Sequence, residues 1–158
     1  MNGMSVTVGQ AVPDFSAAVT GDCIIRLSEL CGRRLVLYFY PKDNTPGCTV
    51  EGRQFRDLHP RFAALNTVVF GVSRDNIRSH ENFRARQDFP FDLISDGDEA
   101  LCRLFDVIKL KKNYGKEALG VERSTFLIDE NGVLRHEWRK VKTDGHAAAV
   151  LAAVAALD

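Results

Sequence analysis

The stretch LVLYFYPKDNTPGCTVEG, residues 35–52, decides the fold. Its first six residues, 35–40, are apolar without alternation, which is typical of a strand buried on both faces. Pro41 ends this run, and a polar loop with a Pro-Gly turn then leads to Cys48. An amphipathic segment follows, so the pattern predicts a buried strand, a loop and a helix that begins near Cys48.

The predicted helix after Cys48 has one apolar face. Its apolar residues recur at steps of three and four, as Phe55, Leu58, Phe62 and Leu65. Pro60 lies inside this pattern, and we expect it to kink the helix or to split it in two, because proline removes a backbone hydrogen bond.

Strands and helices alternate along the rest of the chain. Before residue 35, the expected strands are SVTVGQ (5–10), DFSAAVT (14–20) and CIIRL (23–27). After the first helix, the expected elements are a strand (67–73), a helix capped by Ser73 or Asp75 (76–87), a short helix (96–105), a hairpin about Asn131-Gly132, and a terminal helix capped by Thr143 or Asp144. This order predicts an α/β fold with a mixed central sheet flanked by helices on both faces.

The composition is that of a globular protein, and 158 residues fit a single domain, 1–158. Lys+Arg and Asp+Glu balance at 21 each, so we expect neither nucleic acid nor an anionic membrane surface as a partner. No apolar run reaches the length of a membrane span. The first ten residues lack the basic and apolar regions of a secretory signal, so the expected location is the cytoplasm.

The cysteine and histidine spacings favour no metal site. The four cysteines form no C-x-x-C pair, and the four histidines show no metal-ligand spacing. We therefore expect no metal and no cofactor. The segment 109–118 is basic, and its composition indicates a solvated connecting loop.

Cys48 is the candidate nucleophile because it falls at the expected start of a helix, where free N–H groups and the helix dipole favour an anion. An ordinary thiol with a pKa near 8.5 is only about 3% ionised at neutral pH. A helix end contributes about 0.3–2 kcal/mol towards ionisation, which is too little by itself to keep most of the thiol ionised at neutral pH. A nearby cation is therefore required, and the candidates are Arg53 and Arg123.

Residues 41–49, PKDNTPGCT, have the pattern P-x-x-x-T-x-x-C. With FYPKDNTPGCTVEG (39–52), GVSRDNIRSHENF (71–83), FDLISDGD (91–98) and ERSTFLIDENGVL (122–134), this loop resembles the peroxiredoxins of the PrxQ or bacterioferritin-comigratory subfamily. The resemblance spans almost the whole chain. It implies a thioredoxin-like fold with strand additions at the N-terminus.

The resemblance also implies roles for individual residues. Cys48 would be the peroxidatic cysteine, Thr45 would hydrogen-bond the peroxide, and Pro41 would shape and shield the pocket. Arg123 would be the active-site arginine, and Glu51 would hold an arginine in place. The implied activity is thiol-dependent reduction of hydrogen peroxide and organic hydroperoxides through a sulfenic acid on Cys48.

One position departs from the family. Many members carry a resolving cysteine five residues after the peroxidatic one, or in the following helix, but this chain has Arg53 and the cysteine-free segment NIRSHENFRARQ (76–87) there. Three cycles remain open. The first is a one-cysteine enzyme recycled by thioredoxin, glutaredoxin, glutathione or another thiol, the second uses Cys102 as resolving residue, and the third cross-links subunits through Cys48, Cys23 or Cys31. Cys102 is otherwise explained as a packed apolar side chain.

Other functions compete with peroxide reduction as explanations of Cys48. A cysteine phosphatase needs C-x5-R, but the arginine position counted from Cys48 holds Gln54. A non-enzymatic redox sensor or holdase that uses Cys48 oxidation as its signal is the alternative. The resemblance favours a monomer.

Overall fold

The structure is a computed structural model that describes residues 5–157, with the backbone alone at Asn113. A seven-stranded sheet has the order β2-β1-β5-β4-β3-β8-β9. Its strands are β1 (Ser16–Val19), β2 (Cys23–Arg26), β3 (Arg34–Phe39), β4 (Thr67–Ser73), β5 (Leu93–Ser95), β8 (Ser124–Ile128) and β9 (Leu134–Trp138). β3, β4 and β5 run parallel and the outer strands pair antiparallel, so the mixed sheet is confirmed.

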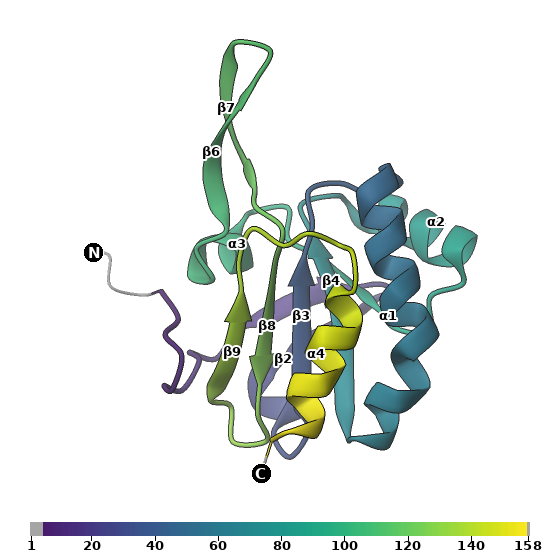
Figure 1. Cartoon of the computed structure of the whole chain (residues 1–158), viewed down its shortest axis with the longest axis vertical. Helices are drawn as coiled ribbons and strands as arrows, with labels where there is room; N and C mark the ends of the chain where they lie inside the picture. The colour runs from purple at the N-terminus through teal and green to yellow at the C-terminus, as the bar shows by residue number, and fades with distance from the viewer. Residues whose placement is uncertain (1–4, 158) are drawn as a thin grey trace.

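Helices cover both faces of this sheet. They are α1 (Pro46–Ala64), α2 (Ile77–Gln87), α3 (Ala100–Leu104) and α4 (His146–Ala155), with a 3₁₀ turn, η1 (Leu27–Leu30). α1 and α4 lie side by side on one face (Figure 1). Leu27 of η1 and Leu101 of α3 belong to the apolar core of the other face.

The central strand β3 separates two apolar cores, as the unbroken apolar run predicts. One core, core A, includes Leu35, Leu37 and Phe39, and the other, core B, includes Val36, Tyr38 and Tyr40. Burial of each large side chain stabilises the fold by roughly 1.5–3 kcal/mol, so this strand holds both layers together. The loop that leads to Cys48 leaves its carboxyl end.

The expected strand at residues 5–10 is wrong. Gly9 has φ +92° and the Gln10 N–H donates to the Thr7 carbonyl at 3.1 Å, so the segment turns instead of extending. It touches the sheet through the isolated bridge Ala11–Val133. The N-terminal strand addition therefore consists of β1 and β2 and joins the sheet through β5.

Pro60 does not split the first helix, because α1 runs through it from Pro46 to Ala64. Pro60 is exposed, and proline removes one backbone bond from a helix of 19 residues. The expected caps of two helices are also wrong. Asn76 caps α2 by accepting the Ser79 N–H at 2.8 Å, and Gly145, with φ +68°, precedes α4.

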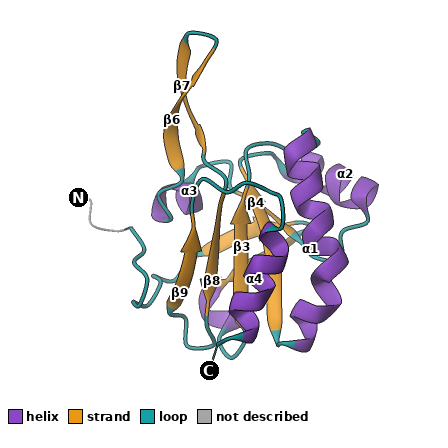
Figure 2. Ribbon diagram, in the orientation of Figure 1, coloured by secondary structure: helices purple, strands orange, loops and turns teal. Residues whose placement is uncertain are grey.

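The basic segment expected as a loop forms a hairpin of β6 (Ile108–Asn113) and β7 (Lys116–Val121). Tyr114 and Gly115 both have positive φ, +54° and +78°, which is the geometry of a two-residue type I′ turn. Figure 2 shows this hairpin standing away from the body of the molecule. The short strand β5 was not predicted from the sequence either. Within residues 5–157, none of the helices combines the length and apolar character needed to cross a bilayer.

Candidate active site

Cys48 is the third residue of α1, and its side chain is 2% exposed. The loop before it is short and conformationally restricted, because Asn44 is left-handed with φ +65° and Pro46 occupies the first helical position. The first α1 bond runs from the Thr49 N–H to the Thr45 carbonyl at 2.9 Å. The N–H groups of Gly47 and Cys48 therefore precede the helical ladder and can meet an anion.

Arg123 reaches the thiol from the segment between β7 and β8. Its Nη2 donates to Cys48 Sγ at 3.4 Å, and its Nη1 donates to Glu51 Oε1 at 2.7 Å. The guanidinium thus brings Arg123 together with two residues of α1, Cys48 and Glu51, and all three are candidates from the sequence. The planar fork of arginine suits this double contact, which a lysine cannot reproduce.

Glu51 is fully buried beneath this contact. Burial raises the pKa of Glu51 to about 7, although the charge and hydrogen bond of Arg123 act to lower it. Its second oxygen, Oε2, has no hydrogen-bond partner among residues 5–157. For Arg123, burial lowers the pKa but the charges of Glu51 and Cys48 outweigh it, so its pKa is raised and the group stays cationic.

Thr45 and Pro41 both belong to the loop that leads from β3 to α1. Thr45 is the N-cap residue of α1, but its side chain does not cap the helix. Its hydroxyl donates instead to the Lys42 carbonyl at 2.9 Å, so the hydroxyl oxygen keeps its lone pairs for a further donor. Pro41, directly after Tyr40, is half-buried.

Two features of the site were missed from the sequence. A Cβ placed on Gly47 would lie 3.2 Å from Arg123 Nη2, so glycine lets the guanidinium approach the helix. Lys111 of β6 is the second, although the residue is exposed. Partial desolvation and then the charges of Arg123 and Arg74 lower the pKa of Lys111, while the charge of Cys48 acts to raise it. The alternation of side chains in the hairpin could have indicated Lys111, whereas nothing local indicates the contact at Gly47.

Cys102 occupies a different environment. It is fully buried in core A, whereas Cys48 belongs to core B across the sheet. The Cys102 N–H donates to Asp96 Oδ2 at 2.7 Å. Burial and the Asp96 carboxylate together raise the pKa of the Cys102 thiol far above its usual value. The structure does not bring this residue to Cys48.

The other sequence candidates lie apart from the site. Arg53 Nε donates to Gln87 Oε1 at 2.9 Å, so the cation that meets Cys48 is Arg123. Cys23 and Cys31 are exposed free thiols. Cys23 lies on the edge strand β2, four strands from β3, and Cys31 precedes β3 at the end opposite Cys48.

Comparison with known proteins agrees with this fold and shows the family. The AhpC/TSA family model matches residues 8–137. Peroxiredoxin Bcp of Xanthomonas campestris is 54% identical over 143 residues, which cover 90% of this chain and 89% of that protein. Peroxiredoxin Bcp of Bacillus subtilis is 49% identical over 148 residues, 94% of each chain.

Solved structures give the same result. A structure from work on alkyl peroxide reduction by the Xanthomonas campestris bacterioferritin comigratory protein has a TM-score of 0.86 and 54% identity, and the match covers 90% of each chain. The peroxidoxin BcpB structure from Mycobacterium tuberculosis has a TM-score of 0.85 and 32% identity, over 97% of this chain and 99% of that one. The chain therefore belongs to the AhpC/TSA family and is a peroxiredoxin of the Bcp/PrxQ type, a thiol-dependent peroxidase.

Proposed function

We propose that Cys48 is the peroxidatic cysteine of a one-cysteine peroxidase that an external thiol recycles. The observation that carries this proposal is the guanidinium of Arg123, which donates to both Cys48 Sγ and Glu51 Oε1. A fixed cation beside a thiol at a helix start favours the thiolate, which is the nucleophile.

In the oxidising step, the Cys48 thiolate attacks the terminal oxygen of a hydroperoxide. The sulfur–oxygen bond forms as the oxygen–oxygen bond breaks, and the departing hydroxide or alkoxide takes a proton to leave as water or alcohol. Cys48 becomes a sulfenic acid. Arg123 and the N–H groups at the start of α1 are positioned to stabilise the negative charge that moves onto the departing oxygen.

Thr45 orients the peroxide in this proposal. Because its hydroxyl hydrogen is used by the Lys42 carbonyl, the Thr45 oxygen acts as an acceptor for the peroxide O–H. Pro41 shields the same approach. The nearly complete burial of Cys48 favours a narrow substrate terminus, which both hydrogen peroxide and alkyl hydroperoxides present. The alkyl peroxide reduction activity of the similar Xanthomonas campestris protein supports alkyl hydroperoxides as substrates.

The positions of the other cysteines favour an external thiol as the reductant of the Cys48 sulfenic acid. Cys102 is separated from Cys48 by the sheet, and Cys23 lies four strand spacings from β3, about 19 Å at 4.8 Å per strand. An incoming thiol condenses with the sulfenic acid to a mixed disulfide and water, and a second thiol releases Cys48 as its own disulfide forms. Thioredoxin, glutaredoxin and glutathione each supply this chemistry, and this cycle requires a reducing compartment such as the cytoplasm. We further propose that the protein acts as a monomer.

Two measurements test the proposal. Purified protein with dithiothreitol or thioredoxin should consume hydrogen peroxide, and Cys48→Ser should reduce consumption to the background rate, whereas Cys23→Ser should leave it unchanged. Consumption that Cys48→Ser does not alter contradicts the proposal.

The cycle is tested separately by mass spectrometry after one equivalent of peroxide. A dimedone adduct on Cys48 is expected, and excess peroxide should carry Cys48 to sulfinic acid because no internal thiol intercepts the sulfenate. A Cys48–Cys102 disulfide would contradict the one-cysteine cycle, and a cross-linked dimer would contradict the monomer.

A further inference from the structure

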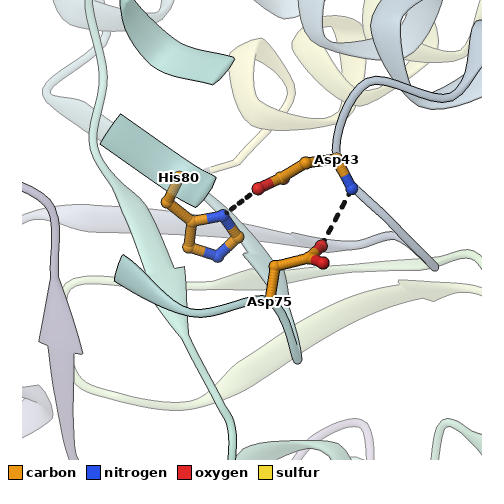
Figure 3. A group of neighbouring side chains, drawn as sticks. All are labelled: Asp43, Asp75 and His80. Carbon is orange, nitrogen blue, oxygen red and sulfur yellow. Dashed lines mark hydrogen bonds and ion pairs between the residues drawn. The ribbon is translucent and has the colours of Figure 1, made fainter. Parts of the chain in front are cut away.

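A second polar cluster, formed by the buried Asp43 and His80 and the half-buried Asp75, includes part of the loop that leads to Cys48 (Figure 3). Asp43 belongs to that loop, Asp75 follows β4, and His80 lies on α2. His80 Nδ1 is 2.7 Å from Asp43 Oδ2, and the Asp43 backbone N–H donates to Asp75 Oδ2 at 2.8 Å. His80 is fully buried and Asp43 is nearly so.

Both ring nitrogens of His80 contact oxygen atoms. Its Nε2 lies 2.8 Å from the Ile94 carbonyl oxygen, which can only accept, so Nε2 carries a hydrogen. Nδ1 meets the Asp43 carboxylate, which also accepts the hydroxyls of Ser79 and Tyr40 at 2.7 and 2.6 Å. Both ring nitrogens therefore face oxygen acceptors, and protonated His80 would satisfy both contacts as an ion pair with Asp43.

The titration of Asp43 agrees with this assignment. Burial raises the pKa of Asp43, but the hydrogen bond and charge of His80, followed by the hydrogen bonds of Tyr40 and Ser79, outweigh it. The pKa of Asp43 consequently lies below its usual value. Among the described residues, the carboxyl groups of Asp43 and Asp75 and the ring of Tyr40 lie near the His80 ring.

The same contacts argue against a metal ion, although the three side chains lie close enough to share one. A metal needs the lone pair of a ring nitrogen. Both nitrogens of His80 already lie within hydrogen-bond distance of protein oxygen atoms, at 2.7 and 2.8 Å. The residues fit a hydrogen-bonded ion pair and do not fit a metal centre.

Asp75, which accepts the backbone N–H of Asp43, connects the reactive loop and its ion pair to the central sheet. Ser73 at the end of β4 donates to Asp75 Oδ2 at 2.7 Å, and Ser95 of β5 donates to the Asp75 carbonyl at 2.7 Å. Asp43 precedes Thr45 by two residues and Cys48 by five. Because Asn44 is left-handed and Pro46 has a restricted φ, a shift of Asp43 is transmitted to Thr45 and the start of α1.

We propose that the buried His80–Asp43 ion pair sets the position of the peroxide-binding loop, so that both residues are positioning residues for the reaction at Cys48. This inference rests on the proposed peroxidase function. Neither residue touches substrate: each acts through the placement of Thr45 and of the first turn of α1. A loop that moves by a fraction of an ångström leaves the thiol intact but misaligns the peroxide.

The first test separates alignment from thiol reactivity. In His80→Gln, the second-order rate of Cys48 oxidation by hydrogen peroxide should fall about tenfold to hundredfold, as expected for a misplaced reactive group. Alkylation of Cys48 by iodoacetamide should stay unchanged or become faster, because the Arg123 contact lies outside the cluster. His136→Gln, in an exposed histidine of β9, is the matched control. An unchanged peroxide rate, or equal losses in both reactions, would overturn the proposal.

The second test uses the wild-type protein and a double-mutant cycle. The ¹⁵N spectrum of the His80 ring at neutral pH should show both nitrogens protonated, and a single protonated nitrogen would refute the ion pair even if His80→Gln fails to fold. Asp43→Asn should also slow oxidation, and the double variant should recover part of the loss, because neither charge is then left buried alone. Strictly additive losses would contradict the pairing.

Failure of the proposed peroxidase function and failure of the positioning role give different results. If wild-type protein reduces no peroxide, the peroxidase assignment fails, while the ring spectrum still decides whether the ion pair exists. If wild-type protein is active and His80→Gln is equally active, only the positioning role fails.

Discussion

Cys48 and Cys102 occupy the same local position but have opposite electrostatic surroundings. Each is a buried third residue of a helix, α1 and α3 respectively. Cys48 meets the guanidinium of Arg123, whereas Cys102 meets the carboxylate of Asp96. The two thiols therefore differ in the sign of the neighbouring charge and not in their position on the helix.

Removal of the cation should have the largest effect on this contrast. Arg123→Gln should lower the rate of Cys48 oxidation about 10²–10³-fold, the usual cost of losing one donor to a developing oxyanion. Arg123→Lys, which keeps the charge but not the fork, should lose less. Stopped-flow measurement of peroxide consumption under single-turnover conditions checks both. A rate equal to that of wild type would show that the Arg123 contact does not assist the reaction.

Displacement of the cation should have a smaller effect. In Gly47→Ala the new Cβ would stand 3.2 Å from Arg123 Nη2, so the guanidinium must move by a few tenths of an ångström. We expect peroxide reduction to slow about tenfold. Alanine is a better helix former than glycine, so thermal unfolding should show no loss of stability. A loss of activity that accompanies a loss of stability would contradict this explanation.

The charge beneath the cation should appear in the pH dependence of stability. The pKa of Glu51 is raised from 4.5 to about 7 by burial, so the folded protein binds this proton more tightly than the unfolded chain does. The resulting stabilisation is complete below the unfolded value and is lost as pH rises to about 7. Glu51→Gln should lack this loss, which corresponds to roughly 3 kcal/mol.

Urea unfolding at several pH values between those limits checks this prediction. The quantity to compare is the difference between variant and wild type, because His146 contributes the opposite trend. Burial and then Arg123 lower the pKa of His146 to about 4, so its contribution is lost as pH falls. Glu29→Gln, at an exposed glutamate, is the control. Parallel curves for Glu51→Gln and wild type would contradict the raised pKa.

Removal of the second thiol should have the smallest effect on activity. Cys102→Ala should leave the turnover of peroxide with an external thiol unchanged, and should cost only about 1 kcal/mol of stability, as is typical of a single core substitution. Native-state alkylation should label Cys48 before Cys102, because Asp96 and burial keep Cys102 protonated. A variant that can no longer be recycled would make Cys102 a resolving residue after all.

The elements that the sequence predicted well are those whose signal is local. The apolar run at 35–40, the helix after Cys48 and the hairpin at Asn131-Gly132 depend on periodicity and turn chemistry among neighbours. The hairpin of β6 and β7 was not predicted because the charged residues of the segment 109–118 indicated a solvated loop. The turn at Gly9 was not predicted because a short apolar alternation indicated a strand. Both turns depend on residues with positive φ. Pro60 was overestimated because a single lost bond on an exposed helix face is tolerated.

By itself, the sequence determined the strand, loop and helix that present Cys48, together with the family resemblance of the loop from Pro41 to Thr49. Only the tertiary structure decided which charges surround each thiol. Arg123 comes from 75 residues beyond Cys48, and His80 meets Asp43 across 37 residues. Local patterns encode backbone conformation, but the environment of a buried charge depends on which distant segments the sheet brings together.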